Sequence, residues 1–154
     1  MTIQTRLFGT IGVNEEKKIY FENGIIGFPD MKNFLIIHDE EKKDEIGISW
    51  LQSVEEPGIA LPVINPLIVK PDYNPVVNDD LIAPLGELQP EEMLVLVTVT
   101  IPAKLEDMTS NLKAPIIINA ETRKGCQIAV ENEDYLVKFP IYNILQTKQE
   151  KVGE

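Results

Sequence analysis

The side chains best suited to chemistry in this sequence are a single histidine, His38, and a single cysteine, Cys126. Any Ser-His-Asp or Cys-His device would have to use His38 as its base. Only Arg123 and Lys124 stand close to Cys126 in the sequence, too little positive charge to make its thiol reactive. We interpret His38 as a surface residue at a strand end and Cys126 as an inert, half-buried thiol.

Adjacent carboxylates are the remaining candidates for acid–base chemistry. They are Glu55-Glu56, Asp79-Asp80, Glu91-Glu92 and the group Glu131, Glu133 and Asp134. Neighbouring residues of a strand point to opposite faces, so they make poor catalytic pairs. The start of a short helix explains Asp79 and Asp80, because carboxylates are favourable at a helix N-terminus. We therefore predict no catalytic residue and no enzyme activity.

Metal and phosphate sites also lack their usual residues. A structural zinc site takes four ligands from Cys and His, and this chain has one of each. The charged run Asp39–Glu45 is typical of a solvated loop and has no calcium-loop pattern. No glycine-rich phosphate loop occurs. The sequence predicts no metal and no cofactor.

The charge balance restricts the partners. Lys and Arg total 14 and Asp and Glu total 25, a formal net charge of −11. Such a chain repels nucleic-acid phosphates and anionic membrane surfaces. The acidity fits either an electrostatic role or solubility alone. The N-terminus lacks the apolar core of a signal peptide, and the longest apolar run, Met93–Ala103, is too short to span a bilayer. We expect a soluble, cytoplasmic protein that is monomeric alone.

Strand patterns dominate the elements that would position these side chains. The runs are Ile3–Phe8, Lys18–Glu22, Phe34–Ile37, Ile46–Leu51, Ile59–Ile64, Leu67–Val69, Leu94–Thr100, Pro115–Asn119 and Gln127–Glu131. Turn residues separate them at intervals of about ten residues, as in sandwiches and barrels. We predict an all-β fold: a small antiparallel β-barrel-like single domain with one or two short helical turns.

Helix signals are short and few. Asn78–Ile82 is typical of a cap followed by a first turn, and Pro90–Met93 and Pro29–Asn33 each predict a single turn. No segment shows helical periodicity over ten residues. We expect one domain over residues 1–145 and a polar, frayed tail over residues 146–154.

Four segments together form a pattern more specific than composition. They are Ile19–Pro29, Trp50–Pro57, Met108–Asn119 and Arg123–Gln127. Their order and spacing resemble the flagellar assembly factor FliW family over residues 1–145. Where this chain has Leu61, the family more often has phenylalanine.

The resemblance implies a protein-binding regulator. Members of the family bind the RNA-binding translational regulator CsrA and stop it repressing flagellin mRNA. They also bind cytoplasmic flagellin, which displaces CsrA, so the family is a partner switch and a chaperone of flagellin. The family fold is a small antiparallel β-barrel-like domain with no cofactor and no enzyme activity.

Three segments are candidate contact surfaces for such partners. The Gln52–Glu56 loop ranks first, since polar loop residues often carry function. The acidic start of the Asn78–Ile82 turn follows. Prolines flank Leu67–Val69, which favours an edge strand that could receive a flagellin peptide. The predicted contacts are Gln52, Ser53, Glu55, Glu56, Asp79, Asp80, Leu67, Ile68 and Val69.

A barrel that carries a small apolar ligand in its interior is the alternative function. Such a carrier needs an empty pocket of several hundred cubic ångströms inside the barrel. Many aliphatic residues and few aromatic ones favour a filled interior instead.

Overall fold

Short strands with peripheral helices make up the chain, whose computed structural model describes residues 2–38, 48–86 and 89–152. The strands are β1 (Thr2–Thr5), β2 (Gly9–Gly12), β3 (Ile19–Phe21), β4 (Asn33–His38), β5 (Ser49–Ser53), β6 (Ala60–Ile64), β7 (Met93–Thr100), β8 (Thr109–Ser110), β9 (Ile116–Asn119), β10 (Lys124–Gln127) and β11 (Phe139–Pro140). The helices are α1 (Pro66–Val69), α2 (Asp79–Ile82), α3 (Tyr142–Val152) and the 3-10 turns η2 (Ala83–Leu85), η3 (Pro90–Glu92) and η4 (Leu105–Asp107).

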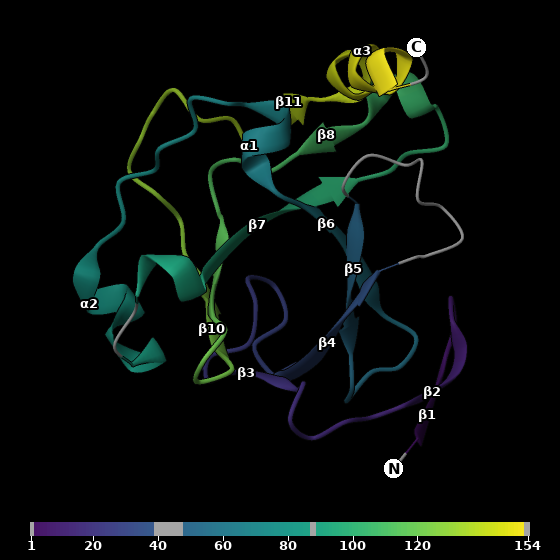
Figure 1. Cartoon of the computed structure of the whole chain (residues 1–154), viewed down its shortest axis with the longest axis vertical. Coiled ribbons are helices and arrows are strands. Elements are labelled where there is room, and N and C mark those ends of the chain that lie inside the picture. The colour runs from purple at the N-terminus through teal and green to yellow at the C-terminus, as the bar shows by residue number, and fades with distance from the viewer. Residues whose placement is uncertain (1, 39–47, 87–88, 153–154) are drawn as a thin grey trace.

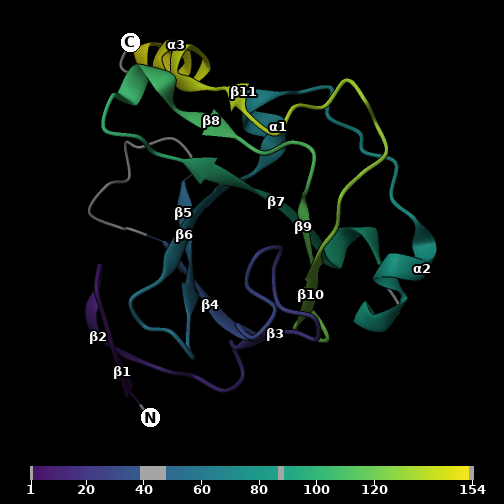
Figure 2. The same ribbon diagram turned by 180° about the vertical axis from the view of Figure 1, so that it is seen from behind.

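Among the described residues, seven strands close into a barrel in the order β7-β6-β5-β4-β3-β10-β9, with β9 pairing back to β7. Figure 1 looks into this ring, and Figure 2 shows it from behind. The β10–β3 pair is parallel, and the other pairs of the ring are antiparallel. The predicted all-β, barrel-like fold is confirmed, with this one parallel pair added.

The interior of the barrel is filled by side chains. Alternation along the strands turns residues such as Leu51, Ile116 and Ile118 inward, where all three are buried. The rings of Phe21 and Phe34 meet edge to face with centroids 5.2 Å apart. Gly125 lies against Phe21, and a Cβ at this position would stand 2.8 Å from the ring. The packed interior argues against a ligand carrier.

The loop between β3 and β4 covers one opening of the barrel, where Figures 1 and 2 both place it within the ring. Its Ile25 and Met31 are each 4% exposed and join the interior cluster. Gly24 has a φ of +64°, and a Cβ there would lie 2.4 Å from the carbonyl oxygen of Phe28. Only glycine fits this turn without strain.

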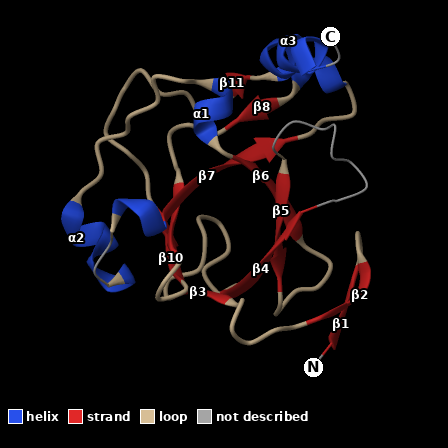
Figure 3. Ribbon diagram, viewed as in Figure 1, coloured by secondary structure: helices blue, strands red, loops and turns tan. Residues whose placement is uncertain are grey.

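A second apolar cluster lies where β8, β11 and α1 meet the wall of the barrel. The rings of Tyr73 and Tyr135 lie with centroids 4.7 Å apart at an interplanar angle of 45°, and the Tyr73 hydroxyl donates to the Leu112 carbonyl at 2.7 Å. Burial, with Tyr135 beside it, raises the pKa of Tyr73. All helices stand outside the ring, as Figure 3 shows, and the β1–β2 hairpin forms a separate sheet.

The prediction of an edge strand over Leu67–Val69 is wrong. These residues belong to helix α1, because the Asn65 side chain caps the Leu67 N–H at 3.0 Å and Pro66 occupies the first turn. The predicted turns at Asn78–Ile82 and Pro90–Met93 are confirmed as α2 and η3.

Other differences concern the C-terminal part of the chain. The predicted strand over Gln127–Glu131 is displaced, because the residues that pair are Lys124–Gln127. Helix α3 was not expected, since its sequence has a weak apolar stripe. A frayed end to this helix stays a prediction. The predicted Asp39–Glu45 loop and the His38 side chain lie outside the described residues.

Candidate functional site

The turn after β5 contains the first-ranked contact residues, and two of them are fully buried. The Gln52 amide Nε2 donates to the carbonyls of Ser53, Pro57 and Ile59 at 2.9, 3.0 and 3.1 Å. The Ser53 hydroxyl accepts the Glu56 N–H at 3.0 Å. Both side chains are 0% exposed, so they shape the turn and cannot reach a partner in this conformation. We therefore correct their role from contact residues to positioning residues.

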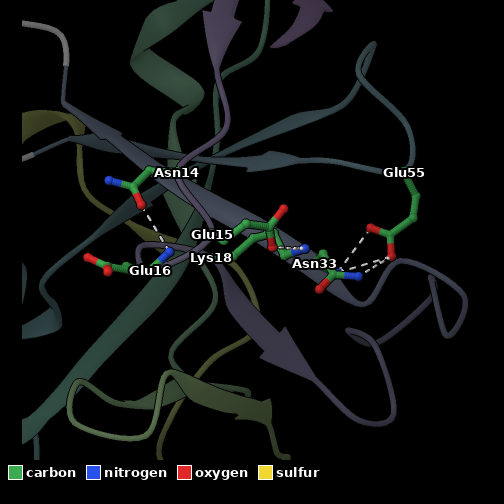
Figure 4. Close-up of polar contacts among 6 residues, drawn as sticks. All are labelled: Asn14, Glu15, Glu16, Lys18, Asn33 and Glu55. Atoms are coloured by element: carbon green, nitrogen blue, oxygen red, sulfur yellow. Dashed lines mark hydrogen bonds and ion pairs between the residues drawn. The ribbon is translucent and has the colours of Figure 1, made fainter. Parts of the chain in front are cut away.

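Glu55 is exposed but already bound within the chain, as Figure 4 shows. Its carboxylate accepts the Asn33 Nδ2 at 2.9 Å and the Asn33 and Lys32 backbone N–H groups at 3.0 and 3.2 Å. Partial burial raises the pKa of the Glu55 carboxyl, but these hydrogen bonds outweigh it and hold the pKa below its usual range. Glu55 thus ties the turn to the start of β4.

The remaining contacts in Figure 4 are local. The Asn14 side chain accepts the Glu16 N–H at 2.9 Å, and Lys18 pairs with Glu15 at 2.8 Å. These contacts order the segment before β3. They are exposed, so we assign them little weight in stability or binding.

The β1–β2 hairpin holds the same turn from another side. Arg6 donates its backbone N–H to Pro57 at 3.3 Å and its Nε to Gly58 at 3.1 Å. Phe8 meets Trp50 edge to face at 6.0 Å. Of the four predicted residues in this turn, Glu56 alone is exposed with a side chain that makes no hydrogen bond or ion pair among the described residues, so the turn offers little free polar surface.

Asp79 and Asp80 lie exposed at the start of α2, where Asn78 caps the helix. Next to them a pocket of about 570 Å³ opens between α2–η2, β10 and the β3–β4 loop. We call it the α2 groove. Exposed apolar side chains line it, namely Tyr20 at 43%, Ile26 at 58% and Leu81 at 49%. Cys126 also lines the groove, and burial raises the pKa of its thiol.

A second pocket, of about 370 Å³, lies between α1, the Tyr73–Val77 segment and the start of β7. We call it the α1 groove. Leu67 and Met93 line it and are 51% and 44% exposed. Ile68 is half-buried and Val69 is buried, so both pack inward from α1. The lining contains no charged residue.

The predicted contact residues do not form one site. The turn follows β5, whereas the α2 groove adjoins β10, and these strands lie across the ring from each other. The chain segment from Tyr73 to Leu85 contributes lining residues to both grooves. Sequence reasoning missed Tyr20 and Ile26. No local signal separates Ile26 from Ile25, since both lie between Gly24 and Gly27, yet Ile25 is 4% exposed and Ile26 is 58% exposed.

Exposed apolar side chains line both grooves. The described residues contain no group of three or more His, Cys, Asp or Glu placed to hold a metal ion. Within the same residues, every helix is too short or too polar to cross a membrane. A filled barrel with apolar grooves on its outer wall defines the class: a small β-barrel protein with apolar grooves on its outside.

Comparison with known proteins agrees with this class. The FliW protein family model matches residues 2–141. The flagellar assembly factor FliW of Lachnoclostridium phytofermentans is 44% identical over 151 residues, which cover 98% of this chain and 97% of the relative. That of Caldanaerobacter subterraneus subsp. tengcongensis is 48% identical over 146 residues, covering 95% and 96%. A crystal structure of the flagellar assembly factor FliW superposes with a TM-score of 0.83 at 30% identity, covering 92% of this chain and 96% of the other. The chain belongs to the FliW family.

Proposed function

We propose that this chain is a flagellar assembly factor that works by binding two proteins, CsrA and flagellin. Bound to CsrA, it prevents repression of flagellin mRNA. Bound to flagellin, it releases CsrA and shields the flagellin subunit in the cytoplasm. The chain acts as a regulator and chaperone without enzyme activity.

The observation that carries this proposal is the clustering of exposed apolar side chains in two grooves outside a filled barrel. Single exposed apolar residues are normal on protein surfaces, but grooves that gather several of them are typical of protein contacts. Tyr20, Ile26 and Leu81 meet in one groove and Leu67 and Met93 in the other. Two grooves could serve two partners.

Net charge supports the choice of CsrA as one partner. An RNA-binding regulator must present a basic surface, and a body of formal charge −11 is attracted to such a surface. Once docked, the same charge repels RNA. Displacement of RNA from CsrA should therefore weaken as salt is raised from about 0.05 to 0.5 M. Displacement that does not depend on salt would leave the acidity as a solubility feature.

Titration of one partner against the complex of the other tests the proposal. The purified chain is mixed with labelled CsrA, and flagellin is added while binding is followed by anisotropy. We expect both proteins to bind and flagellin to displace CsrA. Failure to bind either protein would refute the proposal. If the apparent Kd for CsrA rises in proportion to the flagellin concentration, the two sites overlap. If a ternary complex forms with reduced affinity for CsrA, the two sites are separate and coupled.

A further inference from the structure

Strand β7 has an unpaired edge at its beginning, among the described residues. On one flank, Met93–Leu96 pairs with β9. On the other flank, pairing with β6 covers only Val97 and Thr98. Strand β6 ends at Ile64, and the chain then turns at Asn65 into helix α1. The place that a longer β6 would occupy is the α1 groove.

The backbone groups of Met93 and Val95 point toward this groove. The Glu92 carbonyl accepts the Ala120 N–H at 2.9 Å, so the hydrogen-bonding groups of Glu92 face the β9 side. These groups alternate in direction along an antiparallel strand, which places those of Leu94 on the β9 side and those of Met93 and Val95 on the opposite side. Among the described residues, no backbone hydrogen bond joins Met93 or Val95 to Asn65, Pro66 or Leu67.

Proline explains why the chain leaves this edge open. Continued register from Val63 opposite Thr98 would bring Pro66 opposite Val95. Proline has no N–H to donate, and Pro66 instead begins a helix. The edge therefore keeps strand-like donors and acceptors without a partner strand, beside exposed Leu67 and Met93.

The chemistry of the groove defines its occupant. Unpaired strand groups are satisfied by an extended backbone and not by a helix, whose own groups are already bonded. The lining holds no charged residue, which selects against charged side chains. Met93 has a flexible side chain that can adapt to different aliphatic neighbours.

We propose that the α1 groove binds an extended, uncharged aliphatic segment of a partner protein, which adds a short strand to β7 at Met93 and Val95. This inference rests on the proposed function for the existence of such a partner. It adds the site and the mode of binding, which is strand addition.

Amide hydrogen exchange tests the mode of binding directly. Exchange of the full chain is followed by NMR, alone and with saturating flagellin or CsrA. We expect the Met93 and Val95 amides to become protected by about tenfold or more with one of the two proteins, because they gain acceptors. The Leu94 and Leu96 amides, already facing β9, are the internal reference and should change little.

Substitution tests the side chains of the groove. Leu67→Glu places a charge at a position that is 51% exposed, and we expect about a tenfold or greater loss of affinity for the same protein. Leu105→Glu is the matched control, since Leu105 is 49% exposed in a short helix outside both grooves. Circular dichroism of both variants confirms that they fold.

The outcomes separate this inference from the proposed function. Binding with unchanged Met93 and Val95 exchange, or with full affinity in Leu67→Glu, overturns strand addition and leaves the proposed function intact. Absence of any binding overturns both. Protection that appears with the chain alone and grows with its concentration identifies a second copy as the occupant, and that result also overturns the inference.

Discussion

The turn after β5 and the α1 groove differ in whether their polar groups are hydrogen-bonded within the chain. In the turn, the buried Gln52 amide satisfies three carbonyls, and the Glu55 carboxylate collects three donors. In the groove, the side chains are apolar and exposed, and the strand edge behind them is unpaired. Most polar groups of the turn are therefore bonded within the chain, with the buried Gln52 Oε1 as an exception among the described residues, whereas the strand edge at the groove has no partner strand.

The difference shows why polarity in a loop is a poor sign of a contact surface. A loop carries backbone groups that must be satisfied, and polar side chains beside it often serve that purpose. An exposed aliphatic side chain has no such internal use. In this molecule, the exposed apolar residues point to binding better than the polar turn does.

The largest expected effect is loss of stability when the turn is opened. Gln52→Ala removes the side-chain donor of the Ser53 carbonyl and leaves a cavity in place of a fully buried side chain, and both effects are costly. The Pro57 and Ile59 carbonyls lose the same donor but keep a backbone N–H partner each. We expect the free energy of unfolding to fall by about 2–4 kcal/mol. Urea denaturation measures it, with Gln4→Ala at an exposed strand position as the control. A change as small as that of the control would mean that Gln52 is not structural.

A substitution in the α1 groove should leave the stability of the chain nearly unchanged and weaken its affinity for the partner. Met93→Gln removes an apolar side chain that is 44% exposed, so we expect stability to change by less than about 0.5 kcal/mol. Affinity for the partner that occupies the groove should fall about five- to tenfold. Calorimetry gives the affinity and thermal unfolding gives the stability. If Met93→Gln kept full affinity but lost stability, the side chain would serve the fold and not binding, which would contradict the contrast between the turn and the groove.

Glu55 allows a pH test of the turn. Its carboxyl pKa is lowered from 4.5, so the stability it contributes is present above that value and is lost as pH falls through the lowered pKa. Glu55→Gln should cost about 0.5–1 kcal/mol at pH 7, a small value because the contacts are exposed. The difference in the free energy of unfolding between Glu55→Gln and the unsubstituted chain should vanish at low pH. Glu56→Gln serves as the control, and an equal pH dependence in both variants would contradict the role of Asn33.

The smallest expected effect lies beside the groove, where Glu92 meets Glu121. A hydrogen bond with Glu121 raises the pKa of Glu92, and burial and the charges of Glu121 and Glu91 raise it further. A raised carboxyl pKa means that ionisation costs stability as pH rises through the folded-state value. Glu121→Gln should therefore raise the melting temperature slightly at pH 7, and this gain should shrink as pH falls from the raised pKa of Glu92 towards 4.5 and be absent below 4.5. Glu133→Gln is the control, and an equal gain at all pH values would exclude this pair as its source.

Much of the fold was predictable because strands leave a local signature. The β-branched runs at Leu94–Thr100 and Pro115–Asn119 became β7 and β9, and their alternation agrees with which residues face the interior. Leu67–Val69 misled the prediction, since three aliphatic residues suit a short strand or a buried helix turn equally. The cap at Asn65 decided for the helix.

Much less of the candidate site was predictable. The sequence gives the residue types of Gln52 and Leu67 but does not indicate that Gln52 is buried and Leu67 is exposed. That depends on where the Pro57 and Ile59 carbonyls fold back and on where β6 stops pairing, both of which are contacts between distant residues.

By itself, the sequence determined the β-rich class, the acidic charge and the family pattern, because each is a property of local residue types and their order. Only the tertiary structure decided which polar groups are hydrogen-bonded within the chain and which strand edge has no partner strand. Those outcomes depend on ring closure: β9 pairs with the first half of β7, β6 ends too early to cover the other flank, and the α1 groove results from that mismatch.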